Sequence, residues 1–444
     1  MSQAVRGGGL AAARWLARLA VLAAAGVLAV LVVALGSGGL LVVVYGLLGL
    51  VVCAVGGWWF LAYRGVVRIA GAAVAVAAPV AVLILFTVDG LWLMALLLAL
   101  CWAATLACAK AALRRSRPWR PRRPRRVPAV SRPRHPVIIM NPKSGGGKVG
   151  RFGLVERAEA LGARVVLLDP SAPADVTALA RTAVAQGADL LGVAGGDGTQ
   201  ALVAAVAADH DLPFLVVSAG TRNHFALDLG LDRADPARCL DALTDGEELR
   251  VDLGTVAGRA FVNTVSFGVY ADVVQRPEYR DAKAGTALGL LPDLLIGEGV
   301  RRLDGHADGT VLAAQQALLI SNNPYGPADA LGAGGHRPRL DSGTLGVVGI
   351  RVESAAQAAA LAVRGAQSSG LSVLTARRVE VTSELPEIPV AVDGEALRMP
   401  TPVVVTLRPR ALRVLLPRDR SPVTAPAPRV DWRRLLRLAW GRTP

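Results

Sequence analysis

Four long apolar runs near the start of this 444-residue chain constrain its fold more than any other feature. They cover residues 15–36, 39–62, 66–88 and 91–109. A helix rises about 1.5 Å per residue, so about 20 residues cross a hydrocarbon layer of about 30 Å. A second apolar run follows the first at once, which a cleaved signal peptide would not show. We therefore predict four transmembrane helices within residues 1–112.

Basic residues flank these runs and indicate their orientation. Residues 1–134 hold 16 of the 49 Lys and Arg residues and one acid, Asp89, whereas residues 135–444 hold 33 basic and 33 acidic residues. The basic residues precede the first run, separate the second from the third, and follow the fourth. Cytoplasmic loops carry such an excess. We expect a multi-pass protein of the cell membrane, with both termini and the rest of the chain in the cytoplasm.

Residues 113–136 form an Arg/Pro-rich linker, in which proline blocks a helix and favours an extended chain. The linker has two compatible interpretations, a cationic segment on an anionic membrane surface and a solvated spacer. We expect no nucleic-acid partner, because the positive charge lies beside apolar runs and Trp119 alone offers no stacking platform. The cysteines show neither a disulfide framework nor a zinc spacing. The sequence gives no oligomeric state.

Two further domains follow the linker. Residues 137–248 alternate predicted strands with predicted helices, a pattern typical of a parallel α/β domain. The strands cover 137–141, 163–169, 189–195 and 213–220, and the helices 149–161, 173–187 and 198–208. Residues 249–418 are rich in strands and predict a mainly antiparallel β domain, with helices inserted at 292–300 and 354–368. Residues 419–444 form a basic tail whose amphipathic helix either lies on a membrane surface or packs on the protein.

Three glycine-rich loops follow predicted strands at one edge of the α/β sheet, where such folds bind ligands. The first, residues 141–148, is NPKSGGGK; Val149 follows its last lysine, which excludes a Walker A motif. The second is Gly195-Gly196-Asp197-Gly198-Thr199, and the third is SAGTRNHFA at 218–226. Glycine lets a phosphate approach a helix N-terminus, and Asp197 could hold Mg²⁺. Each loop alone is also ordinary turn chemistry, but three at one edge favour a phosphate site.

With these loops the sequence resembles the diacylglycerol kinase catalytic domain family, which includes bacterial lipid kinases and sphingosine-kinase-like enzymes. The resemblance spans about residues 137–410 and rests on NPKSGGGK, GGDGT and AGTRNHFA in order, LDSGTLGV at 340–347, and VDGE at 392–395. GGDGT alone also occurs in NAD kinases. The resemblance implies a two-domain NAD kinase and diacylglycerol kinase-like fold, a parallel α/β domain plus a mainly antiparallel β domain, with ATP and Mg²⁺ as cofactors.

The resemblance also implies roles for individual residues. Glu395, Asp393 and Asp197 would be catalytic, with Glu395 as the proton acceptor and Asp393 as its partner, although the reverse assignment of these two stays open. Asp341 and Asp197 would bind metal. The nucleotide phosphates would lie against the glycine-rich loops, at Asn141, Ser144, Gly145, Gly195, Gly196, Asp197, Gly198, Thr199, Gly220, Thr221 and Asn223. Without the resemblance, Asp393-Gly394 is a good hairpin turn.

The sequence departs from the family pattern at three places where the family has acidic residues. His224 follows Asn223 where the family has Asp, Ala201-Leu202 stands where it has Asn-Glu, and Ser342 replaces the second acid of its DDGxL motif. These changes affect the metal arrangement more than the ATP site.

The sequence favours a membrane-bound, ATP-dependent lipid kinase that phosphorylates a lipid hydroxyl, such as that of diacylglycerol, because a fused membrane segment raises the local concentration of an insoluble acceptor. One alternative is a kinase for a soluble acceptor, like the NAD kinases. A second is a catalytically impaired, membrane-tethered sensor of nucleotide or lipid.

Overall fold

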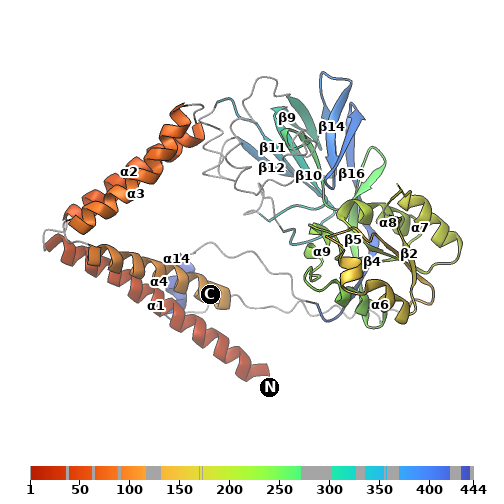
Figure 1. Ribbon diagram of the computed structural model, residues 1–444, viewed down its shortest axis with the longest axis horizontal. Helices are drawn as coiled ribbons and strands as arrows, with labels where there is room; N and C mark the ends of the chain where they lie inside the picture. Colours follow the sequence, from red (N-terminus) through yellow and green to blue (C-terminus); the bar gives the residue numbers. More distant parts are fainter. Residues whose placement is uncertain are drawn as a thin grey trace. The chain divides into compact units, whose positions relative to one another are not determined.

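The computed structural model describes residues 2–36, 40–62, 66–88, 92–116, 132–169, 171–172, 174–271, 302–326, 336–354, 357, 370–420 and 432–440. The chain divides into two compact units, Met1–Arg125 with Pro426–Pro444, and Arg126–Ala425 (Figure 1). The helix predicted over 292–300 lies outside the described residues, as does most of the one predicted over 354–368. We refer to the units as the helical unit and the catalytic unit, and describe each by itself.

The helical unit contains four long apolar helices, of which three are candidate membrane spans. The helices are α1 (Ser2–Gly36), α2 (Leu40–Ala62), α3 (Val66–Val88) and α4 (Trp92–Ser116). The candidate spans among the described residues are Ala12–Val33, Val66–Leu85 and Trp92–Ala112. In α2 the apolar stretch found among the described residues is shorter, Val44–Phe60. The structure therefore gives three candidate spans within its described residues, where the sequence predicts four.

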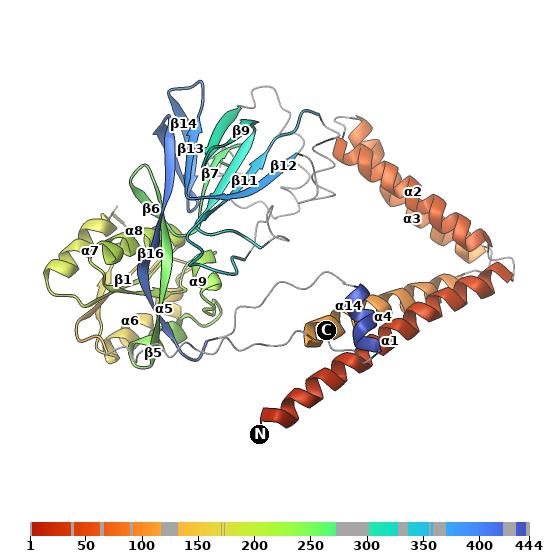
Figure 2. The same cartoon turned by 180° about the vertical axis from the view of Figure 1, so that it is seen from behind.

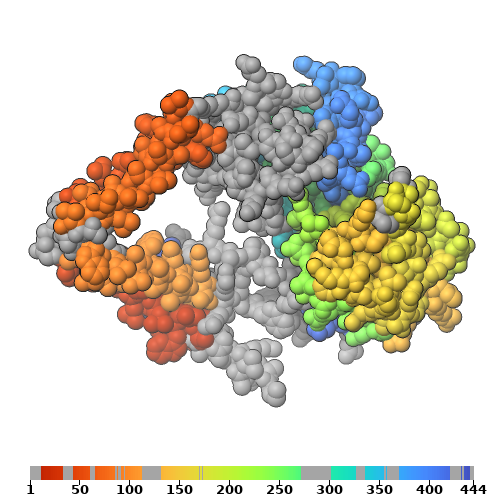
Figure 3. All heavy atoms as spheres, viewed as in Figure 1, coloured from red at the N-terminus to blue at the C-terminus, as the bar shows by residue number. Residues whose placement is uncertain are grey.

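The long helices pack in pairs through small residues. Helix α2 packs against α3 and α1 against α4, and Figure 2 shows both pairs side by side. A Cβ built on Gly56 of α2 would lie 2.6 Å from the backbone nitrogen of Ala75 in α3, so the two backbones approach closely. Many large apolar side chains on α1 to α4, coloured red and orange in Figure 3, are exposed, as expected of lipid-facing helices.

The first lobe of the catalytic unit is the predicted α/β domain. Its strands β1 (Pro136–Met140), β2 (Arg164–Leu167), β3 (Leu190–Ala194) and β4 (Pro213–Val217) are parallel, in the order β2-β1-β3-β4. Strands β1 and β3 are buried along their whole length, because helices cover both faces of such a sheet. The helical segments are α5 (Lys148–Arg151), α6 (Leu154–Ala160), α7 (Val176–Ala185), α8 (Asp197–Asp209), α9 (His224–Asp228) and η1 (Pro236–Leu243).

One predicted helix of this lobe is broken in two. The sequence pattern predicts a single helix over 149–161, but α5 ends at Arg151 and α6 begins at Leu154. Gly153, which precedes α6, has a left-handed backbone with φ of 55°. Glycine adopts this conformation at little cost, and it ends a right-handed helix.

The second lobe is built from antiparallel strands, as the sequence predicts. One sheet has the order β12-β11-β10-β7-β14-β15. Its strands are β7 (Thr264–Gly268), β10 (Ala317–Ser321), β11 (Leu345–Ile350), β12 (Leu371–Ala376), β14 (Glu387–Val392) and β15 (Glu395–Pro400). The others, β5 (Gly246–Val256), β6 (Arg259–Phe261), β8 (Leu303–Ala307), β9 (Thr310–Gln315) and β13 (Arg378–Thr382), belong to the sheet that continues from the first lobe.

A single long strand joins the two lobes. Strand β16 (Val403–Pro417) pairs with β13 through its first residues and runs parallel to β4 through Arg413–Leu415. From Val405 to Pro417 it also pairs with β5, with a register shift between Arg408 and Leu412. The end of the β-rich segment therefore completes the sheet of the first lobe. Because one strand belongs to both lobes, the loops at the edge of the parallel sheet are held at fixed positions relative to the β14–β15 hairpin.

Candidate active site

The first glycine-rich loop folds back on itself after β1. The Asn141 N–H donates to the Ala194 carbonyl over 2.9 Å, and the N–H groups of Gly147 and Lys148 donate to the Ser144 carbonyl. Gly145, Gly146 and Gly147 all have left-handed backbones, with φ of 56°, 71° and 80°. Only glycine adopts three such conformations in a row without strain.

The first loop packs against the third. A Cβ on Gly145 would lie 2.3 Å from the Ala219 carbonyl oxygen and 3.0 Å from that of Gly220. Lys148 also reaches toward the third loop, since its Nζ donates to the Ser218 carbonyl over 3.5 Å and to the Arg233 carbonyl over 2.8 Å. This lysine is thus held by backbone oxygens rather than aimed at a phosphate. Burial, reinforced by nearby arginines, lowers its pKa from the ordinary value.

The second and third loops interlock around Asp197. This side chain is 9% exposed, and its carboxylate accepts the N–H groups of His224 over 3.1 Å and Phe225 over 3.4 Å. A Cβ on Gly220 would lie 2.8 Å from the Cα of Gly196, so only glycine fits there. Asp197 therefore binds the N-terminus of α9 as well as beginning α8.

Buried amides complete this junction. The Gln200 Nε2 donates to the Gly195 carbonyl over 3.1 Å and to the Asn223 Oδ1 over 3.3 Å, and the Asn223 Nδ2 donates to the Gly220 carbonyl. Both side chains are fully buried. His224, which stands where an acid was expected, has its pKa lowered by burial and is therefore a neutral imidazole near pH 7.

Glu395 of the distant VDGE segment lies against the second loop. A Cβ built on Gly198 would come within 2.2 Å of the Glu395 Oε1, so this carboxylate reaches the start of α8 only because residue 198 is glycine. The other Glu395 oxygen pairs with Arg259 of β6. The Glu395 side chain is 45% exposed, which leaves it open to an incoming group.

Asp393, two residues earlier, has a different environment. Asp393 and Gly394 have φ of 47° and 87°, as in a two-residue hairpin turn between β14 and β15. The Asp393 carboxylate accepts the N–H groups of Val262 and Asn263 over 2.8 Å each, and of Thr264 over 2.9 Å. Burial raises the pKa of Asp393 to about 7, and the nearby charge of Asp197 acts in the same direction.

A buried arginine connects the segments that hold the two aspartates. Arg337, whose side chain is fully buried, donates its Nε to Asp228 over 2.6 Å, at the end of α9. Its Nη1 donates to the Val262 carbonyl and its Nη2 to the Asn263 Oδ1, each over 2.7 Å. A continuous path of polar contacts thus runs from Asp197 through α9 and Arg337 to the turn that binds Asp393. His336 also contacts Asp228.

The arrangement fits the phosphates of a nucleotide at the start of α8. Gly196 precedes this 13-residue helix, has an extended backbone and makes no side-chain cap. A Cβ there would meet nothing within 4 Å, so there is room at the N–H groups of the first turn, where the helix dipole favours an anion.

In nucleotide sites Mg²⁺ often has one or two carboxylate ligands, and phosphate oxygens and water complete its shell. Asp197 could provide such a carboxylate here. Among the described residues no group of three or more His, Cys, Asp or Glu side chains could hold a metal by itself. Asp341, the other predicted ligand, instead forms an ion pair with Arg339 over 3.1 Å. Its role stays a prediction.

Most of the predicted site residues come together at these contacts, and others were missed. The structure gathers Asn141, Gly145, Gly195, Gly196, Asp197, Gly198, Gly220, Asn223, Asp393 and Glu395, while Ser144 and Thr199 lie within the same loops and Thr221 is exposed. Sequence reasoning did not find Arg259, Asp228 and Arg337. Arg259 pairs with Glu395 and Asp228 pairs with Arg337, and both contacts join residues more than 100 positions apart, so no local pattern could identify them.

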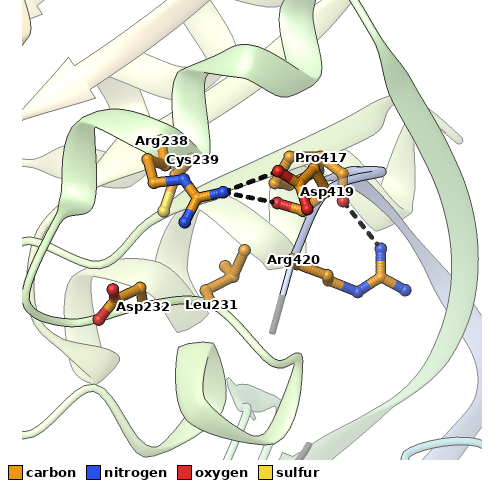
Figure 4. Close-up of a pocket in the computed structure, with 7 residues that line it drawn as sticks. All are labelled: Leu231, Asp232, Arg238, Cys239, Pro417, Asp419 and Arg420. Carbon is orange, nitrogen blue, oxygen red and sulfur yellow. Dashed lines mark hydrogen bonds and ion pairs between the residues drawn. The ribbon is translucent and has the colours of Figure 1, made fainter. Parts of the chain in front are cut away.

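A small pocket in the catalytic unit holds none of the predicted site residues. Figure 4 shows Arg238 reaching Asp419, whose Oδ2 it contacts over 3.0 Å, and Arg420 donating to the Pro417 carbonyl over 3.1 Å. Burial raises the pKa of the Cys239 thiol beside them, which keeps it protonated. These contacts join η1 to the end of β16 and have a structural role.

Comparisons with known proteins agree with this geometry. Residues 135–256 match the diacylglycerol kinase catalytic domain. The chain is 30% identical over 266 residues to the protein named probable lipid kinase YegS-like from Pseudomonas fluorescens, covering 55% of this chain and 83% of that protein. It belongs to the diacylglycerol kinase catalytic domain family.

Other members of the family support the assignment. The Diacylglycerol kinase of Mycobacterium tuberculosis (strain CDC 1551 / Oshkosh) is 28% identical over 303 residues, covering 63% of this chain and 94% of that one. A crystal structure from Bacillus anthracis, described as a candidate diacylglycerol kinase, superposes with a TM-score of 0.51 at 18% identity, covers 65% of this chain and 98% of that one, and shows the shared fold. The chain is accordingly an ATP-dependent kinase that acts on an alcohol group.

Proposed function

We propose that this kinase is membrane-bound and transfers the γ-phosphate of ATP to the hydroxyl of a membrane lipid, such as diacylglycerol, at the cytoplasmic face. The observation that carries the proposal is the close approach of Glu395 to Gly198, because an accessible carboxylate then lies beside the loop that we expect to bind phosphate. The lipid acceptor is favoured because the relatives from Mycobacterium tuberculosis and Pseudomonas fluorescens carry lipid-kinase names and because this chain has three candidate spans.

The proposed reaction is an in-line phosphoryl transfer. The N–H groups at the start of α8 hold the nucleotide phosphates, and Asn141, Gly145 and Gly220 shape the loops around them. Mg²⁺, when bound, neutralises charge on the phosphates. The acceptor hydroxyl oxygen forms a bond to the γ-phosphorus, the bond from that phosphorus to the β–γ bridging oxygen breaks, and ADP leaves. Glu395 accepts the hydroxyl proton.

The two carboxylates of the VDGE segment have different proposed roles. Asp393 accepts three backbone N–H groups and fixes the turn that presents Glu395. Glu395 is the more accessible of the two and faces the phosphate loop, which suits a proton acceptor. Arg259 orients the Glu395 carboxylate through its ion pair.

The proposal is tested with full-length protein in mixed micelles, given [γ-³²P]ATP and, separately, a total lipid extract, diacylglycerol, NAD or no acceptor. We expect label in a chloroform-soluble product with the lipid acceptors and none in NAD. Label in NAD alone would establish the soluble-acceptor alternative. Binding of ATP without transfer to any of these acceptors would favour the sensor alternative.

A further inference from the structure

The C-terminal helix α14 (Trp432–Ala439) belongs to the helical unit although about 300 residues of the catalytic unit precede it. Its Leu435 and Leu438 side chains are fully buried. They form one apolar cluster with alanines of α1 and α4, namely Ala17, Ala20, Ala109 and Ala112. Figure 2 shows α14 beside these two helices. The short side chains of alanine let α14 approach both helices closely.

Helix α14 packs at one end of two candidate spans. Ala17 and Ala20 lie near the start of the span Ala12–Val33, and Ala109 and Ala112 lie at the end of the span Trp92–Ala112. The two pairs of alanines meet in one cluster, so they mark the same end of the α1–α4 pair. At the end of a span, hydrocarbon gives way to lipid headgroups.

A basic side chain fastens α14 at this level. The Arg18 Nε of α1 donates to the Ala439 carbonyl over 3.1 Å, and its guanidinium lies 5.6 Å from the ring centre of Trp15. An arginine at a helix C-terminus satisfies one of the last carbonyls and complements the helix dipole. The orientation of α14 across the span ends is therefore fixed by a polar contact as well as by leucine packing.

The face of α14 beside the packed leucines carries large apolar side chains that the protein does not cover. Trp432, Leu436 and Trp440 are 44%, 40% and 70% exposed, and their spacing of four residues places them on one side of the helix. Arg437 is also exposed and lies on a different side. Tryptophan and arginine are the residues enriched where hydrocarbon meets headgroups.

We propose that α14 is an interfacial helix, whose Trp432–Leu436–Trp440 face enters the headgroup–acyl boundary of a bilayer that contains anionic lipid. Lipid is the occupant because α14 continues the surface of two candidate spans at their ends, where a bilayer would surround them. In the sequence, Arg14 and Arg18 lie at the start of the span Ala12–Val33, and arginines follow directly after the span Trp92–Ala112, so basic residues flank these span ends and favour anionic headgroups. The catalytic unit is then connected to this end of the spans through both ends of its chain. The inference does not depend on the identity of the acceptor.

The depth of single positions in a bilayer tests this proposal. The full chain, with Cys53, Cys101, Cys108 and Cys239 replaced by alanine, receives one nitroxide label through Trp440→Cys, Arg437→Cys or Leu28→Cys. Each protein is reconstituted in vesicles of phosphatidylcholine and phosphatidylglycerol. The electron-spin relaxation of each nitroxide is then measured with oxygen, which concentrates in lipid, and separately with a water-soluble nickel chelate. Leu28 is 66% exposed within the candidate span Ala12–Val33 and reports whether that span lies in the bilayer.

We expect oxygen to relax the labels at 28 and 440 at least threefold more than the chelate does, and the order to reverse at 437. The proposal would be overturned if the chelate relaxed the label at 440 as strongly as the label at 437 while the label at 28 still reported lipid. Unchanged ATP hydrolysis or transfer by the three labelled proteins confirms that they are folded.

Discussion

At the scale of single residues, Asp393 and Glu395 show how two nearby carboxylates acquire different properties. Asp393 is buried and accepts three backbone N–H groups, whereas the Glu395 side chain is 45% exposed and contacts Gly198. Desolvation disfavours the charged form of the first far more than that of the second. Asp393 thus fixes the backbone of the turn, and this turn presents the accessible carboxylate of Glu395.

The raised pKa of Asp393 predicts a pH dependence. Its carboxylate accepts the N–H groups of the Val262–Thr264 turn more strongly when it is ionised, and with a pKa of about 7 it is increasingly protonated as the pH falls below that value. We expect kcat to rise from pH 6 to pH 8 with a midpoint near 7, and to fall about tenfold per pH unit on the acidic side. The measurement is kcat from pH 5.5 to 9 at saturating ATP. A flat wild-type profile across this range would contradict the account.

Gly145 and Gly146 form a matched pair for testing the loop geometry. Both have positive φ, but a Cβ on Gly145 would lie 2.3 Å from the Ala219 carbonyl oxygen, whereas one on Gly146 would meet nothing within 4 Å. Gly145→Ala must separate the first and third loops, and we expect it to reduce kcat/KM for ATP about 100-fold. Gly146→Ala carries only the backbone strain and should cost less than about 10-fold. Equal losses in the two variants would show that contact between the loops is unimportant.

Arg337 and Arg339 offer a similar comparison for stability. Arg337→Met removes the guanidinium partner of the buried Asp228, which keeps only its contacts with the His336 ring and a backbone N–H, and it removes donors to two carbonyls and an amide, so we expect a loss of about 3–5 kcal/mol in the free energy of unfolding. Arg339 pairs with Asp341 near the surface, with the side chains 56% and 36% exposed. Arg339→Met should cost less than about 1 kcal/mol. Denaturant unfolding of the catalytic unit within the full chain measures both values.

At the scale of elements, the sequence predicted strands well where apolar residues cluster and poorly elsewhere. Strands β1, β3 and β4 are buried and apolar and were placed within a few residues. Strand β8 (LDGHA) was missed because its outward positions are Asp and His around a glycine, which reads as a turn. Strand β15 was missed because most of its residues are exposed on an edge. Strand β8 does alternate buried and exposed positions, but two of its three inward residues are Gly305 and Ala307, which give a weak apolar signal, and β15 shows no such alternation.

The pairing of α2 with α3 supports a prediction at this scale. A Cβ on Gly56 would lie 2.6 Å from the Ala75 nitrogen and 2.9 Å from the Gly71 carbonyl oxygen, while one on the adjacent Gly57 would meet nothing within 4 Å. We expect Gly56→Ala to force the helices apart at a cost of about 1–3 kcal/mol, and Gly57→Ala to be neutral or slightly stabilising. Thermal unfolding of the helical unit in detergent, followed by circular dichroism, separates the two variants. Equal melting temperatures would contradict the close approach of these helices.

At the scale of the whole molecule, the site depends on connections that no local pattern reveals. The three glycine-rich loops were expected at one sheet edge, because the carboxyl ends of parallel strands meet there. That Glu395 reaches the same edge follows from β16, which belongs to both lobes and could be read from the sequence only as an apolar strand. Similarly, the packing of α14 on α1 and α4 depends on alanines more than 300 residues earlier.

The most direct test of the central claim is the rate of the chemical step in Glu395→Gln. The account assigns the hydroxyl proton to this carboxylate, so kcat for transfer from ATP to diacylglycerol should fall about 10²- to 10⁴-fold while the affinity for ATP stays within about twofold. Glu384→Gln, at an exposed position of the same domain, should leave both unchanged. A Glu395→Gln protein with wild-type kcat would contradict the account.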